Sequence, residues 1–502
     1  MPLKTIQNEY EAEREIGYRY LQILGRAETL VPGAGREAID VLLWDAQAAV
    51  IRADVQSDRV VLDSTLNCQA VYRQGEESTL RALSAKSGIS QVTEIPGAQD
   101  GMLCRVLPVV ENVEARYENG HMVFLVSIGL HVRVMKLENL KVITAIEDCE
   151  GIEARYSEMK LTRLAAEATE TAVLTQRVEL PRALDARATL MDWGNAVIDS
   201  AEPDLGGVRV KGKVQIETLV ASGLEGKPAV LVKYPIEFDK LIEIPEWLSN
   251  HVCVTPTLRS IRTQLEAPEE DEEGTLMIQV DVHFDICANL SEDVRALEDA
   301  YSISDVRLEI EQEEMKLCSE AICLRASETV RGTVLLEENA PAVGSVIAVR
   351  VQPNIAELYS AGGRTKINGI LEATVLYMPT GSDMAASAHA QMPFEMELNR
   401  EIGENAAVRI SVNSAEANAL MSDRLEMKIA LNLNAEARIQ NEYSIVTDLQ
   451  LGEKMQKKSG YIICWPGADE DAWTIGKRYA VSEERLLAAG KIENGKPLVI
   501  RV

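Results

Sequence analysis

The stretch Thr365–Tyr377, TKINGILEATVLY, places an apolar or small residue at every second position. This period of two is typical of a β-strand that buries one face, because successive side chains of a strand point to opposite sides. Two other stretches repeat the alternation, Val208–Val220 around Gly212 and Val60–Tyr72 around Ser64. The central small residues are 148 and 157 positions apart, so the sequence predicts three domain-sized repeats.

Other landmarks recur in the same order along the chain. The stretch Tyr234–Phe238 matches Met392–Met396, and Glu298–Ile303 matches Gln440–Ile445. In the second match the two tyrosines are only 142 residues apart, so we expect extra residues in the second repeat. The acidic run Pro268–Gly274 provides them, and because like charges repel we expect a solvated hairpin tip there. A second alternating strand is expected near the end of each repeat, over residues 122–130, 276–284 and 425–433.

These patterns predict a mainly β fold with three antiparallel β-sandwich-like domains. The expected bounds are residues 1–170, which include an N-terminal segment, 171–320 and 321–456. One or two helical turns are expected over Arg36–Asp45. Aromatic residues make up only 4% of the chain, so Val, Ile, Leu and Ala must fill most of the cores. We expect Trp44, Trp193 and Trp247 to be packed there as well, because each buries a large area.

The last 44 residues, 459–502, have a different pattern and predict a small α+β domain of βααβ order. Ser482 is a favourable N-cap for the second helix, and Gly490 is placed to end it. The expected elements are a strand over Tyr461–Cys464, a helix over Asp471–Tyr479, a helix over Ser482–Ala489 and a strand over Gly495–Ile500.

Composition excludes some classes of protein. The chain has 51 Lys and Arg against 79 Asp and Glu, a net charge of −28, and no basic cluster, which argues against nucleic-acid binding. No stretch approaches the roughly 18 apolar residues of a membrane span, and the first residues do not resemble a signal peptide. We therefore expect a cytoplasmic protein.

We expect no enzyme, no cofactor and no metal. The five histidines lack metal-ligand spacing, and phosphate-loop and nucleophile-elbow motifs are absent. The residues Asp281, His283 and Asp285 alternate in a predicted strand, where such side chains usually face solvent. The eight cysteines are scattered, so in a reducing compartment we expect all of them to be free thiols.

Four short motifs recur in the repeats, although no repeat carries all of them. They are Leu30-Val31-Pro32, Gly369 through Leu376-Tyr377, Pro393-Phe394 and Asp299-Ala300-Tyr301-Ser302. Together they resemble the SPOCS domain of spore-coat morphogenesis proteins from endospore-forming bacteria. The resemblance implies a non-enzymatic scaffold that recruits coat layers to the forespore surface from the mother-cell cytoplasm.

The C-terminal segment resembles a LysM domain in the order of Trp473, Ile475, Arg478-Tyr479 and Val481-Ser482. This resemblance implies a groove for N-acetylglucosamine polymers. Two features depart from the family: an acidic loop replaces Gly-Asp-Thr, and Gly490 replaces Asn. The sequence therefore favours a protein partner, which the resemblance implies is the morphogenetic ATPase of the coat basement layer, with other coat proteins as further partners. Binding of peptidoglycan or another N-acetylglucosamine polymer is the alternative.

An apolar patch with an acidic rim is the expected docking surface. Trp465 lies on a predicted loop and is the expected exposed anchor, with Ile463 and Trp473 beside it. The alternative is that Ile463 and Trp473 form the core of the small domain. The candidate partner-binding residues are Ile463, Trp465, Asp469, Glu470, Asp471, Trp473 and Gly490.

Overall fold

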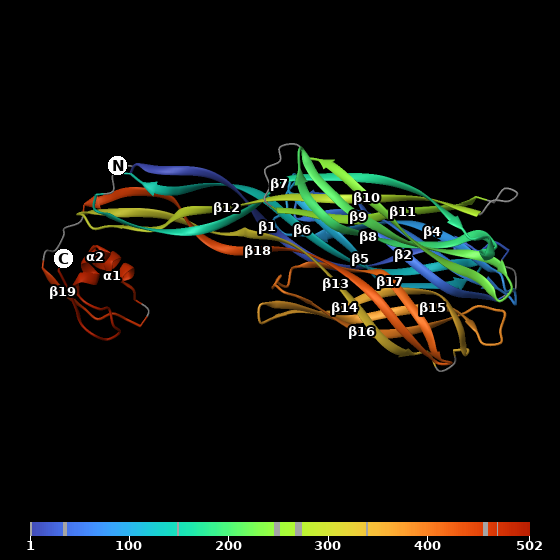
Figure 1. The fold of residues 1–502 in the computed structure, drawn as a ribbon. Coiled ribbons are helices and arrows are strands. Elements are labelled where there is room, and N and C mark those ends of the chain that lie inside the picture. The colour runs from blue at the N-terminus through green and yellow to red at the C-terminus, as the bar shows by residue number, and fades with distance from the viewer. Residues whose placement is uncertain are drawn as a thin grey trace.

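The structure is a computed structural model that describes residues 3–33, 38–147, 150–244, 251–266, 274–337, 340–454, 460–468 and 470–501. Long antiparallel strands make up most of it, and a small helical module lies at one end, near the N-terminus (Figure 1). The predicted mainly β fold is confirmed. No helix within these ranges is long and apolar enough to cross a membrane.

The strands fall into three sets of six with one common topology. The first set is β1 (Thr5–Leu30), β2 (Ile39–Gln56), β3 (Arg59–Gln74), β4 (Leu80–Glu94), β5 (Leu103–Glu118) and β6 (His121–Ile146). The second is β7 (Ile152–Leu180), the 3-10 helix η1 (Arg182–Leu184), β8 (Ala186–Asp204), β9 (Gly207–Leu224), β10 (Lys227–Glu243), β11 (His251–Glu266) and β12 (Gly274–Ser302). The third is β13 (Val306–Leu335), β14 (Val343–Ala361), β15 (Arg364–Pro379), β16 (Ala386–Leu398), β17 (Ala407–Met421) and β18 (Arg424–Lys454).

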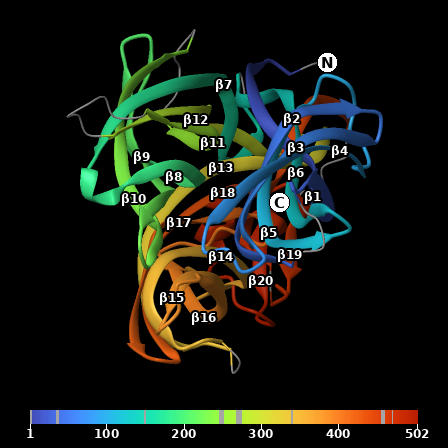
Figure 2. The ribbon, with the colours of Figure 1, turned by 90° about the vertical axis from the view of Figure 1, so that its right-hand side faces the viewer.

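In each set the first, sixth and fifth strands form one antiparallel sheet, and the second, third and fourth form another. A separate apolar core draws side chains from both sheets of each set. Figure 2, which looks along the molecule, shows the three sets as three lobes. The alternating stretches 60–72, 208–220 and 365–377 lie in β3, β9 and β15, each the central strand of its sheet.

Two glycines occupy equivalent positions in these central strands. Gly212 lies opposite Phe238, and Gly369 lies opposite Phe394. A Cβ atom on either glycine would collide with a carbonyl oxygen of the neighbouring strand and with the phenylalanine ring, so the ring packs over the glycine. The match of Tyr234–Phe238 with Met392–Met396 is therefore wrong by two residues. A shift of two keeps the same face buried, so alternation alone does not reveal it.

Two further expectations are wrong. Tyr301 lies three residues beyond the register shift at Glu298, whereas Tyr443 lies four residues before the shift at Thr447, so the two tyrosines are not equivalent. The expected helical turns over Arg36–Asp45 are absent from residues 38–45, where β2 begins at Ile39 because it pairs with β3.

The acidic run lies between β11 and β12, whose pairing extends to Glu266 and Thr275. Of the run itself, only Gly274 is among the described residues. The corresponding connections in the other two sets are only two residues long. The extra residues of the second repeat therefore do lie at the position of the acidic run.

The first and last strands of each set continue past their own core and form a narrow arm (Figure 1). Two apolar clusters in the arm contain residues of all three sets, such as Leu140, Met159 and Leu317. The expected domain boundaries at 170/171 and 320/321 fall inside β7 and β13, which run through both the lobes and the arm.

Apolar contacts also join the lobes at their common axis. Val71, Leu219 and Leu376 hold the same place in β3, β9 and β15, and all three are fully buried in one cluster. Trp193 belongs to this cluster with 5% of its surface exposed, and Trp44 is half-buried, while Trp247 lies outside the described residues. The three repeats therefore share buried surface at the lobes as well as in the arm.

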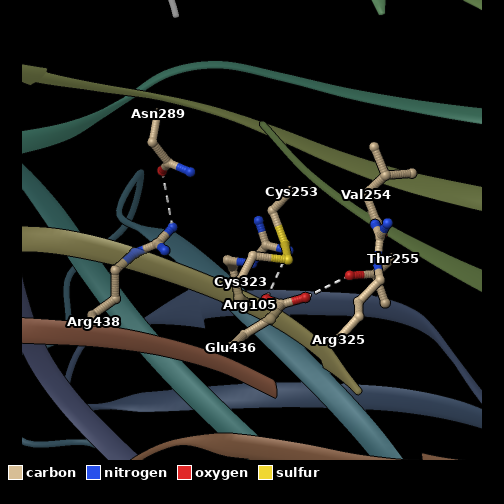
Figure 3. The surroundings of a disulfide bond; sticks show 9 residues. All are labelled: Arg105, Cys253, Val254, Thr255, Asn289, Cys323, Arg325, Glu436 and Arg438. Carbon is tan, nitrogen blue, oxygen red and sulfur yellow. Dashed lines mark hydrogen bonds and ion pairs between the residues drawn. A yellow bond between two sulfur atoms is a disulfide. The ribbon is translucent and has the colours of Figure 1, made fainter. Parts of the chain in front are cut away.

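Buried charges connect the repeats, and Figure 3 shows three of them, Arg105, Glu436 and Arg438. Arg438 of β18 donates to Glu13 of β1 at 2.9 Å and to Asn289 of β12 at 3.2 Å, so one guanidinium of the third set contacts the other two sets. Glu13 is fully buried, and the Arg438 side chain is 6% exposed. Close by, Arg105 pairs with Glu436 at 3.4 Å.

A disulfide lies beside these charges and joins Cys253 of β11 to Cys323 of β13, with their Cα atoms 5.7 Å apart (Figure 3). The expectation of eight free thiols is therefore wrong for this pair. The two cysteines are 70 residues apart in sequence and meet only because β11 and β13 pack together. Cys149 lies outside the described residues; the free cysteines within them are Cys68, Cys104, Cys287, Cys318 and Cys464.

The C-terminal module has the expected order of elements. They are β19 (Tyr461–Cys464), α1 (Ala472–Tyr479), α2 (Glu483–Ala489) and β20 (Leu498–Arg501), with β19 and β20 antiparallel. Asp471 caps α1 by accepting from the Thr474 amide at 2.8 Å, and Ser482 caps α2 by accepting from the Arg485 amide at 3.4 Å. Its core is formed by Cys464, Ile475, Val481, Leu486, Leu498 and Ile500.

Candidate docking surface

The two-stranded sheet of the C-terminal module has one buried and one exposed face. Cys464 and Leu498 face the helices, and alternation along the strands turns Ile463 and its partner Val499 to the other side. Tyr461 and Trp465 extend this apolar face at either end of β19. We call these four residues the sheet face; their exposed fractions are 74% for Tyr461, 53% for Ile463, 61% for Trp465 and 51% for Val499.

Two of the predicted apolar residues thus lie on one exposed surface. The sequence reasoning did not include Tyr461 and Val499, although the alternation of Leu498, Val499 and Ile500 already carries the signal for Val499. The alternative that places Ile463 in the core does not hold, because more than half of its surface is exposed.

Trp473 does not belong to the sheet face. It is 8% exposed and packs edge-on against Tyr301 of β12, with ring centroids 4.9 Å apart. Its indole Nε1 donates to Asp299 Oδ2 at 2.8 Å. The structure therefore places Trp473 between the module and the arm.

The acidic loop is engaged within the molecule. Glu470 pairs with Arg478 and accepts from the Gly467 amide, and these hydrogen bonds hold the pKa of its carboxyl below the usual value. Hydrogen bonds from Thr474 likewise lower the pKa of Asp471, which also lies 3.5 Å from Arg155 of β7. Both carboxylates therefore remain charged and already have partners, while Asp469 lies outside the described residues.

Gly490 is exposed at the end of α2, where its φ of 148° is outside the range that side-chain-bearing residues usually adopt. The loop after it meets the loop after β19, because the Gly495 amide donates to the Pro466 carbonyl at 3.0 Å. The structure therefore joins the loop after α2 to the loop after β19.

A cavity of about 200 Å³, lined by both apolar and charged side chains, lies at the junction of the three repeats. His131 lines it and receives a 2.7 Å contact from the Tyr18 hydroxyl; burial and the nearby Arg133 lower the pKa of His131 to about 4. His283 lies 3.3 Å from Asp285, and burial lowers its pKa. No three His, Cys, Asp or Glu side chains among the described residues gather to hold a metal ion.

These features define a three-lobed β protein that carries a small βααβ module with an exposed apolar face. Residues 37–118 match the family model of the SipL SPOCS domain, a range that covers β2 through β5. This match agrees with the resemblance of the sequence to SPOCS-domain proteins, although the four motifs that carry the resemblance lie outside residues 37–118, and it links the chain to sporulation-related coat proteins. Comparisons with curated proteins and with solved structures found no match.

Proposed function

We propose that the protein is a non-enzymatic scaffold of spore-coat assembly that docks onto a protein partner through its C-terminal module, a LysM-like domain. The observation that carries this proposal is the sheet face. Exposed aromatic and aliphatic side chains on a small rigid element are typical anchors of protein interfaces. The SPOCS domain at residues 37–118 supports the link to the coat.

The partner that we infer is the morphogenetic ATPase of the coat basement layer, with other coat proteins as further partners. We place the interaction in the mother-cell cytoplasm at the forespore surface. The net charge of −28 keeps copies of the chain apart and favours a partner with basic groups around an apolar pocket.

The test is the variant Trp465→Ala in the full chain, with binding to the purified ATPase measured by calorimetry. Because 61% of the Trp465 surface is available for burial, we expect the loss of a hot-spot residue, at least ~30-fold in Kd, or about 2 kcal/mol. The matched control is Leu487→Ala, which removes a side chain that is 62% exposed on α2, across the core from the sheet face, and should leave Kd unchanged.

Unchanged ATPase binding by Trp465→Ala contradicts the proposal. Tight binding of a chitooligosaccharide by the full chain, lost in the same variant, would instead support the glycan-binding alternative. The thermal unfolding midpoint of each variant is measured alongside, because the argument requires the module to remain folded.

A further inference from the structure

The motif Asp299-Ala300-Tyr301-Ser302 lies at the end of β12, at the tip of the arm. Register shifts at Thr144, Glu298 and Thr447 mark equivalent places in the three repeats. Counted from these shifts, Asp299 and Tyr301 correspond to Ala145 and Glu147 in the first repeat and to Asp448 and Gln450 in the third. Only the second repeat pairs a carboxylate with an aromatic ring at this place.

Both side chains of the second repeat, Asp299 and Tyr301, contact α1 or the backbone just after it. Asp299 accepts from Trp473 Nε1 at 2.8 Å and from Lys477 Nζ at 2.6 and 2.7 Å. The Tyr301 hydroxyl donates to the Val481 carbonyl at 3.0 Å, and Tyr301 is 4% exposed. One carboxylate and one aromatic residue thus bind the indole, an ammonium group and the backbone after α1.

The fit continues around the indole. Arg155 of β7 lies 6.0 Å from the centroid of the Trp473 ring and 3.5 Å from Asp471, so it contacts both the ring and the cap of α1. Gly476 faces Tyr301 so closely that a Cβ atom there would collide with the tyrosine hydroxyl. The glycine at the point of closest approach therefore makes room for the tyrosine, while Lys477 matches the charge of Asp299.

We propose that Asp299 and Tyr301 form a receptor site for α1 that holds the C-terminal module on the arm in one orientation. Trp473 then serves as the anchor to the scaffold, and the sheet face, with Trp465, is left for the partner. The assignment of the sheet face to the partner rests on the proposed function, whereas the receptor site does not. The contacts of Asp299 with Trp473 and Lys477, and of Tyr301 with Val481, fix the direction in which the sheet face points.

The experiment is fluorine NMR of the full chain labelled with fluorotryptophan. The five tryptophan resonances are assigned with single Trp→Phe variants, and exposure is read from the shift difference between H₂O and D₂O. Because Trp473 is 8% and Trp465 61% exposed, the shift of Trp473 should be several-fold smaller. In Asp299→Ala/Tyr301→Ala we expect the Trp473 shift to rise toward that of Trp465, because the ring loses its cover.

The matched control is Asp448→Ala, the equivalent carboxylate of the third repeat, which should leave Trp473 unchanged. Unchanged Trp44 and Trp193 resonances show that the lobes are folded. If the double variant disturbs them, Lys477→Ala tests the site from the module side, with Lys496→Ala as its control. We expect Lys477→Ala to raise the Trp473 shift, because Asp299 loses its charge partner.

A Trp473 that is exposed in the unaltered chain, or that stays shielded when Asp299 and Tyr301 are both replaced, overturns the receptor site. The proposed function is tested separately by Trp465→Ala. That variant should lose partner binding while the Trp473 resonance is unchanged. Each proposal can therefore be contradicted while the other stands.

Discussion

Glu13→Gln is the sharpest test of how the three repeats are joined. The substitution keeps the shape of the side chain but removes the charge that faces Arg438, and both groups are almost wholly buried. Leaving one member of a buried ion pair without its partner costs about 3–5 kcal/mol. In this variant Asn289 still accepts from Arg438, and the negative charge of Glu436 still stabilises the Arg438 guanidinium. We therefore expect the free energy of unfolding to fall by the lower end of that range, about 3 kcal/mol.

The assay is equilibrium unfolding in urea, followed by tryptophan fluorescence and by far-UV circular dichroism. The matched control is Glu9→Gln on the same strand. Glu9 lies 3.8 Å from Lys141, and its side chain is 78% exposed, so this variant should change the free energy of unfolding by less than about 0.5 kcal/mol. If the two variants unfold at the same urea concentration, the junction does not hold the repeats together as argued.

Two further predictions concern acid and thiols. Because the pKa of His131 is lowered to about 4 in the folded state, against about 6.5 unfolded, stability should be complete above pH 6.5 and fall as pH drops toward 4. His131→Gln should reduce the fall of the unfolding free energy with falling pH, and the part caused by His283 should remain. An unchanged pH dependence contradicts the role given to His131. Thiol counting on the denatured, unreduced protein should find six thiols rather than eight, since Cys253 and Cys323 are joined, and Cys253→Ser should give seven. Reduction should lower the free energy of unfolding by about 4 kcal/mol, the chain-entropy value for a 70-residue loop, and eight thiols would refute the bond.

The alternation of the sequence predicted the part of the fold that depends on local pattern. Each central strand buries one face, so Val210, Ile216 and their equivalents must alternate with polar residues, and this pattern recurs in every repeat. The order of the C-terminal elements was predictable for a similar reason, because Ser482 and Gly490 are local helix signals. Exposure of Trp465 followed from its place on a loop.

Contacts between distant segments were not predictable in this way. Nothing near Trp473 in the sequence indicates that Tyr301 covers it, because the two are 172 residues apart and meet only once the arm has formed. The same holds for Glu13 and Arg438, which read as ordinary surface charges on alternating strands. The correspondence of Phe238 with Phe394 was not predicted for another reason. A shift of two residues keeps the same face of the strand buried, so alternation does not reveal it.

The length of the strands explains how one chain links its two ends. A strand rises about 3.3 Å per residue, so the 31 residues of β18 span about 100 Å, roughly twice the reach of a helix of that length. β18 runs from its pairing with β17 in the third lobe to the tip of the arm, and β13 pairs with it along almost its whole length. The distance between the lobes and the tip of the arm, which holds the C-terminal module, is therefore set by hydrogen-bonded strands. Such a fixed separation suits the proposed scaffold, because whatever the lobes hold stays at a set distance from the partner bound at the sheet face.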